Sequence, residues 1–129
     1  MTDVRVELRI TADADTTELH AIRQHVTRAA RDFGADDQTI DDFELVVSEL
    51  ATNVINHTAA DEVIVAFRLE DDQWILDVSE ADTLGHLGAG SPPHDSIDGR
   101  GLFIAQALMD VVEIVDIERR RYVRCVKNA

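Results

Sequence analysis

The segment between residues 36 and 57 constrains the fold more than any other part of this chain. Apolar residues recur through it at helical spacing, which predicts one long amphipathic helix from near Asp36-Asp37 to about His57. The residues predicted to face the core are Ile40, Phe43, Val46, Val47, Leu50 and Val54. Such a helix is stable when another layer covers its apolar stripe, so the rest of the chain must supply that layer.

A line of polar residues runs along the same helix. Glu49, Asn53 and His57 follow one another at four-residue steps, and each step rotates by only about 40°, so the three share one face. A carboxylate near a terminal phosphate can orient or deprotonate a hydroxyl, and an amide oxygen suits Mg²⁺. His57 could bond a phosphate or simply cap the helix. The alternative is an ordinary polar edge beside the apolar stripe.

Beyond this helix the pattern indicates strands and helices in one domain. Val4–Ile10 alternates apolar and charged residues, as a half-buried strand does. A first helix is predicted to follow, with Asp13, Asp15 or Thr16 as its N-cap and Gly34 as its C-cap. The other predicted elements are strands Glu62–Leu69 and Gln73–Ser79 around an Asp71-Asp72 turn, a loop Ala81–Asp98, a helix Gly101–Asp110, and a closing hairpin of Val111–Ile117 and Tyr122–Lys127. The stripe of the first helix is predicted to consist of Leu19, Ile22, Val26, Ala29, Ala30 and Phe33. This order predicts a single domain over residues 1–129 with an α/β (α+β) fold, a two-layer sandwich whose mostly antiparallel mixed sheet is covered on one face by three helices.

The composition argues against several classes of function. The chain has a net charge of −14 and one lysine, Lys127, so we expect no direct nucleic-acid binding. It has no apolar run near the length of a membrane span and no visible secretory signal. One cysteine, Cys125, fits a reducing cytoplasm and is expected to be a strand residue. The acidic balance indicates either solubility alone or a partner with a basic surface.

Two other segments carry residue types that suit a nucleotide. Gly99-Arg100-Gly101-Leu102 precedes the third helix, where glycines let backbone N–H groups approach a phosphate and Arg100 adds a charge. Glu80 and Asp82 follow a strand, where a carboxylate can accept a hydrogen bond from the exocyclic amine of a base. Each signal is weak by itself, because a flexible helix entry and a polar strand end have the same composition.

In this order, these segments resemble the GHKL ATPases, and within them the anti-sigma-factor serine kinases of the RsbW/SpoIIAB type. Residues 44–57 resemble the family's N box, which implies that Glu49 is the catalytic base and Asn53 the Mg²⁺ ligand, with His57 at a position often occupied by histidine. Gly99–Leu102 resembles the second glycine box, which contacts the phosphates of ATP, and Ala81–Asp98 would be the ATP lid. The resemblance implies ATP and Mg²⁺ as cofactors, a sigma factor or an anti-sigma-factor antagonist as partner, and a homodimer as one option.

The first glycine box departs from the family pattern. Where the family has Asp-x-Gly-x-Gly, this chain has Glu80-Ala81-Asp82-Thr83-Leu84, so a longer carboxylate and an added charge reshape the adenine pocket. Two functions follow from the resemblance. One is a kinase that holds a sigma factor and phosphorylates a serine or threonine of its antagonist; the other is a module that sequesters a partner without catalysis. A histidine-kinase ATPase domain is a weaker third option, because the chain shows no upstream dimerisation helix and its lid is short.

Overall fold

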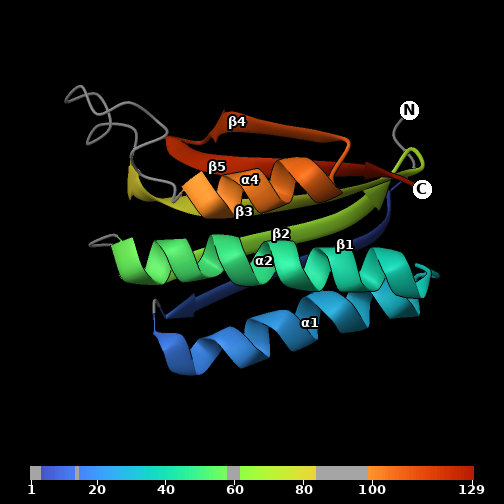
Figure 1. Cartoon of the computed structure of the whole chain (residues 1–129), viewed down its shortest axis with the longest axis horizontal. Coiled ribbons are helices and arrows are strands. Elements are labelled where there is room, and N and C mark those ends of the chain that lie inside the picture. Colours follow the sequence, from blue (N-terminus) through green and yellow to red (C-terminus); the bar gives the residue numbers. More distant parts are fainter. Residues whose placement is uncertain (1–3, 14, 58–61, 84–98) are drawn as a thin grey trace.

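Three helices cover one face of a five-stranded sheet in the computed structural model, which describes residues 4–13, 15–57, 62–83 and 99–129 (Figure 1). The helices of this part are α1 (Leu19–Asp32), α2 (Asp37–His57) and α4 (Gly99–Leu108), with a short 3₁₀ turn, Thr16–Glu18, before α1. The strands are β1 (Val4–Asp13), β2 (Glu62–Glu70), β3 (Gln73–Thr83), β4 (Val111–Ile117) and β5 (Arg120–Asn128). They lie in the order β1-β2-β3-β5-β4.

The two-layer α+β prediction is confirmed. All four strand pairings are antiparallel, so the described sheet contains no parallel pair. Two of the pairings are hairpins, β2 with β3 and β4 with β5, each closed by a two-residue turn. Asp71 and Asp72 have φ of 49° and 62°, and Glu118 and Arg119 have φ of 50° and 67°. Positive φ at both turn residues matches the right-handed twist of the flanking strands. Helix α1 and helix α2 together return the chain from β1 to β2.

Helix α1 ends at Asp32, and the glycine that the sequence singles out, Gly34, follows its C-cap residue Phe33. Gly34 has φ of 93°, and its N–H donates to the Arg31 carbonyl at 3.1 Å. The Ala35 N–H donates to the Ala30 carbonyl at 2.9 Å, which completes a Schellman motif. The prediction that Phe33 belongs to the buried stripe is wrong, since its side chain is 44 % exposed. Phe33 is the C-cap residue, and its backbone (φ −105°, ψ 16°) has left the helical path.

The core lies between the helix layer and the sheet. Every residue that the sequence assigns to the buried side of α2 is buried. From that side Phe43 meets Phe67 of β2 edge-on, with ring centroids 5.0 Å apart, and Phe67 stacks on Trp74 of β3 at 5.6 Å. Each large side chain buried in this way contributes roughly 1.5–3 kcal/mol. These contacts fix α2 across β2 and β3, the strands that lead toward the predicted site.

The helices of the described residues are those of a packed core and not of a membrane span. None of them combines the length and the apolar composition that a bilayer crossing needs.

Candidate functional site

Three segments that the sequence assigns to a nucleotide site meet at one end of the sheet. Figure 1 shows the C-terminal end of α2, the last residues of β3 and the first turn of α4 at the same end of the molecule. Helix α2 packs against both α4 and β3. The fold therefore brings the end of α2, the end of β3 and the start of α4, which are far apart in the sequence, to the same end of the molecule.

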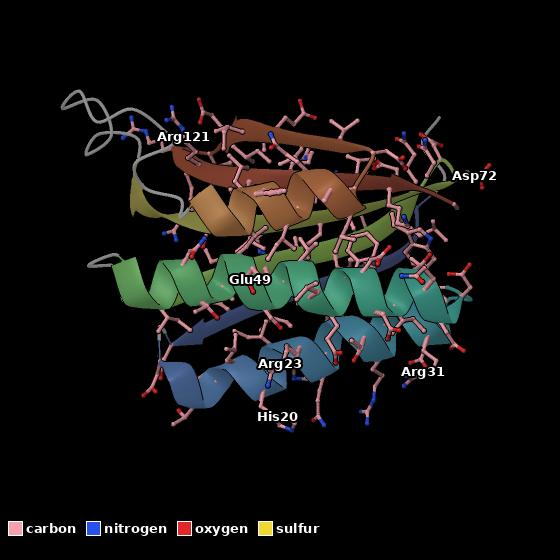
Figure 2. The ribbon with its side chains drawn as sticks, viewed as in Figure 1. His20, Arg23, Arg31, Glu49, Asp72 and Arg121 are labelled. Atoms are coloured by element: carbon pink, nitrogen blue, oxygen red, sulfur yellow. The ribbon has the colours of Figure 1, made fainter. Side chains whose placement is uncertain are left out.

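The middle and end of α2 supply the first part of the site. Glu49 lies about halfway along the helix (Figure 2) and is half-buried. Asn53, one turn further, is only 6 % exposed, and its amide Nδ2 is buried without a hydrogen-bond partner among the described residues. Buried polar atoms are almost always hydrogen-bonded, so an orphaned amide in mid-helix calls for a missing partner. A bound group at this end of α2 would provide one.

The end of β3 separates from both of its neighbours just before Glu80. On the β2 side, regular pairing stops at Val65 and Val78, and the Ile64 N–H donates instead to the Ser79 hydroxyl at 2.9 Å. On the β5 side, the pairs Ser79–Tyr122 and Thr83–Arg120 enclose four residue steps of β3 and two of β5. This mismatch is a β-bulge that spans residues 80–82, and bulges of this kind often re-aim side chains beside active sites.

The predicted end of β3 is wrong, and two of the predicted site residues lie in the bulge near the observed end. The predicted loop begins at Ala81, but β3 continues to Thr83, and residues 84–98 of that loop lie outside the described part of the chain. Glu80 and Asp82, the candidates for the base contact, both belong to the bulge. The structure describes their backbone only, and the same holds for His57, the last residue of α2, and for Arg100.

The first turn of α4 completes the site. Helix α4 begins at Gly99, two residues earlier than predicted, so the segment Gly99-Arg100-Gly101-Leu102 is its first turn. That turn has no acidic residue and carries Arg100, which leaves the positive end of the helix dipole available to an anion. Leu102 is partly buried and packs against the core, so its side chain fixes the first turn of α4 to the core. Ala105, one turn further along α4, is fully buried in the same core.

Lys127, the single lysine of the chain, holds the opposite ends of these helices together. Its Nζ lies 3.3 Å from the Asp42 carboxylate on α2. The same Nζ donates a hydrogen bond of 3.3 Å to the backbone carbonyl of Leu108, which is the last residue of α4. The Gln38 amide also donates to Asp42 at 2.8 Å. Sequence reasoning gave Lys127 no role, because it is separated from both partners along the chain and only the fold brings them together. The lysine fixes α4 relative to α2.

A hollow on the outer side of the helix layer is separate from this site. It is open, has a volume of about 440 Å³, and lies between α1 and α2. His20 and Arg23 line it from α1 (Figure 2), and Glu44, Leu45 and Ser48 line it from α2. None of the residues that the sequence assigns to the nucleotide site lines it. Within the described ranges, moreover, no cluster of three or more His, Cys, Asp or Glu side chains could hold a metal.

Comparisons with known proteins agree with the fold. A family profile, the histidine kinase-like ATPase domain, matches residues 12–127. Among solved structures, the RsbU and RsbW domains of Rv1364c from Mycobacterium tuberculosis are similar over 96 % of this chain, with a TM-score of 0.72 and 22 % identity. This chain spans 32 % of that longer chain, so the similarity concerns the fold. No curated protein matches. Since the profile covers nearly the whole sequence and the fold agrees, this chain belongs to the histidine kinase-like ATPase domain family.

Proposed function

We propose that this protein is an ATP-binding regulatory kinase of the partner-switching type. It would bind a sigma factor and would phosphorylate a serine or threonine of an anti-sigma-factor antagonist. The observation that carries this proposal is the orphaned amide of Asn53, which lies one turn beyond Glu49 on α2, toward the end of the helix where the β3 bulge and the first turn of α4 converge. A purely structural helix has no need of that pair at that place.

The residues present fit a nucleotide and its cation. The unpartnered Nδ2 of Asn53 fits a site in which a phosphate oxygen accepts its hydrogen bond. Its Oδ1 is a hard ligand of the kind that Mg²⁺ selects, and a bound Mg²⁺ would neutralise charge on the phosphates. The backbone N–H groups of Gly99–Leu102 would hold the same phosphates, with no acidic residue in that turn to repel them. Glu80, in the bulge, would accept from the adenine amine.

Glu49 is the residue proposed to act on the acceptor. In the transfer, the hydroxyl oxygen of the antagonist forms a bond to the γ-phosphorus while the bond from that phosphorus to the β–γ bridging oxygen breaks, and ADP leaves. The hydroxyl proton passes to the Glu49 carboxylate. Glu49 is half-buried, so it can be reached from solvent yet is held by its helix. Positioning and electrostatic stabilisation supply most of the rate in such reactions.

The net charge of −14 supports a protein partner with a basic surface. Electrostatic attraction between an acidic and a basic surface speeds their diffusional encounter, and dissolved salt screens this attraction. The association rate with such a partner should therefore fall as ionic strength rises. We propose that the partner is the sigma factor, the antagonist, or each in turn.

Phosphate transfer tests the proposal. With γ-labelled ATP and purified antagonist proteins, the native chain should label the acceptor, and Glu49→Ala should abolish labelling while partner binding is retained. Glu44→Ala is the matched control, because Glu44 is an exposed carboxylate on the same helix with no place in the site. Undiminished labelling by Glu49→Ala would remove Glu49 from its assigned role.

A second function is favoured by one observation, the altered first glycine box. Asp82 occupies the bulge where the family has a glycine, which supports a module that binds its partner without ATP. The double substitution Glu80→Asp, Asp82→Gly separates the two. If the native pocket is only reshaped, the double variant should bind ATP more tightly than the native chain. Equal affinity would count against the pocket argument.

A further inference from the structure

The hairpin formed by β4 and β5 ends in a concentration of positive charge, although the chain as a whole is acidic. Arg119, Arg120 and Arg121 are the only three consecutive basic residues in a sequence whose net charge is −14. The two turn residues are Glu118 and Arg119, and Arg120 begins β5. Two-residue hairpin turns are usually built from asparagine, aspartate and glycine, so this run of arginines, the arginine tip, needs another explanation.

The arginine tip lies at the same end of the molecule as the candidate nucleotide site. Arg120 is paired with Thr83, the last residue of β3 and the first one beyond the bulge at 80–82. Figure 2 shows Arg121 at the end of the molecule where α4 begins. A protein that docks over the bulge and the first turn of α4 would therefore meet the tip.

Two arginines of this hairpin are neutralised within the fold, and two are not. Arg121 donates to a carboxylate of β4 at 2.9 Å, and Arg124 donates to one of β3 at 2.8 and 2.9 Å. Among the described residues, Arg119 and Arg120 form no ion pair. Arg119 is exposed and Arg120 is half-buried. The tip therefore holds two guanidinium groups that a carboxylate from another molecule could bind.

The backbone of the turn indicates that Arg119 is kept there at a cost to stability. Glu118 and Arg119 have φ of 50° and 67°, in the left-handed region that is unfavourable for residues with a Cβ. The β2–β3 hairpin has Asp71 and Asp72 at these positions, and a short polar side chain tolerates this region better. Strained residues of this kind are concentrated at binding sites, where a side chain is required in a fixed place.

We propose that the arginine tip binds an acidic segment of the phosphate acceptor, so that the acceptor serine or threonine has aspartates or glutamates near it. This inference rests on the proposed function, since it names the class of acceptor for the same site. A guanidinium group binds a carboxylate in a fork geometry, which orients the bound segment as well as attracting it. The rest of the chain is strongly acidic and repels such a segment, so the attraction at the tip selects one docking orientation.

Peptide binding in the absence of nucleotide tests this surface. The probes are two synthetic peptides with a central serine, flanked on each side by two glutamates in one peptide and by two glutamines in the other. At low salt, fluorescence anisotropy should show that the native chain binds the glutamate peptide more tightly than the glutamine peptide. The double substitution Arg119→Glu, Arg120→Glu should weaken binding of the glutamate peptide roughly tenfold or more.

Arg28→Glu with Arg31→Glu is the matched control, because it changes the net charge by the same amount. Both arginines are exposed on α1 and form no ion pair within the part of the chain that the structure describes. Figure 2 shows Arg31 at the other end of the molecule from Arg121. The control should weaken binding of the glutamate peptide less than about twofold, since salt screens distant charges. Equal losses in the two double variants, or a native chain without preference for the glutamate peptide, would overturn the proposal.

Arg119→Gly separates recognition from folding. Glycine adopts a φ of 67° without strain, so the melting temperature of this variant should stay at or above the native value. Its affinity for the glutamate peptide should nevertheless fall several-fold, because one of the two guanidinium groups is lost. A variant that binds this peptide as tightly as the native chain does would overturn the proposal.

Two further measurements distinguish this inference from the proposed function. If the native chain labels its acceptor and the variant Arg119→Glu, Arg120→Glu labels it with the same KM, the tip is not the acceptor surface and the proposed function stands. If the tip binds the glutamate peptide but the native chain transfers no phosphate, the proposed function falls and the tip remains a surface for acidic segments. A loss of ATP affinity in the double variant, with peptide binding intact, would assign the two arginines to the nucleotide and overturn the inference.

Discussion

The Ser79 hydroxyl lies 2.9 Å from the Ile64 backbone nitrogen and takes the place of a backbone carbonyl at the point where β2 and β3 part. Ser79 is only 1 % exposed. Directly after it comes the bulge that contains Glu80 and Asp82. This side-chain hydrogen bond stands where the regular pairing of β2 and β3 stops, one residue before the bulge begins.

Ser79→Ala should destabilise the fold by about 1–3 kcal/mol, because it leaves the Ile64 N–H buried without an acceptor. Denaturant unfolding monitored by circular dichroism measures this change. Ser48→Ala is the control: the Ser48 hydroxyl donates only to the Glu44 carbonyl of its own helix, and its loss should change the unfolding free energy by less than about 0.5 kcal/mol. Equal effects of the two substitutions would contradict the role given to Ser79.

The contact between Asp42 and Lys127 should couple α2 to β5. Lys127→Met should cost about 1–3 kcal/mol, less than a fully buried pair would, because the lysine side chain is 23 % exposed. A double-mutant cycle with Asp42→Asn should show non-additivity of about 1 kcal/mol. Additive effects would mean that the two side chains are close without interacting.

Asp36 should make the free energy of unfolding depend on pH below about pH 5. Its carboxylate accepts hydrogen bonds from Thr39, which lower its pKa below the ordinary 3.8. The unfolded chain then binds the proton more strongly, so this stabilisation is present above about pH 4 and is lost as the pH falls through the lowered folded pKa. Asp36→Asn keeps a capping side chain without the titration. The stability difference between native and variant chains should therefore shrink from pH 5 to pH 2, and parallel curves would contradict it.

Cys125 should be chemically silent in the folded protein. Burial raises the pKa of its thiol to about 12, so at neutral pH almost no thiolate forms. A thiol-specific reagent should therefore label it only at the rate of unfolding, and labelling should accelerate with denaturant. Fast labelling of the folded chain would show that β5 opens locally.

The helices and most strand boundaries could be predicted from the sequence because their signals are local. The stripe of α2, the cap at Gly34 and the Asp71-Asp72 turn each depend on neighbouring residues, and each is confirmed. The prediction that Phe33 is buried was wrong because a periodic pattern does not show at which residue the helix ends.

The parts of the site that were missed depend on distant residues. The bulge at 80–82 arises from a mismatch between β3 and β5, and the Ser79 contact joins residues 15 positions apart. Lys127, near the end of β5, meets Asp42 of α2 only because the fold brings two segments together that are 85 positions apart in the sequence. No local pattern contains these relationships, whereas the residue types at Glu49 and Asn53 predict a candidate site from the sequence alone.

Calorimetric titration with ATP and Mg²⁺ tests the central claim most directly. The native chain should bind saturably, and Asn53→Ala should bind at least tenfold more weakly. That variant removes a buried amide nitrogen without a partner, so its unfolding free energy should stay within about 1 kcal/mol of the native value. A folded Asn53→Ala variant that binds ATP as tightly as the native chain, or a native chain that binds none at millimolar ATP, would contradict a nucleotide site at the meeting point of α2, β3 and α4.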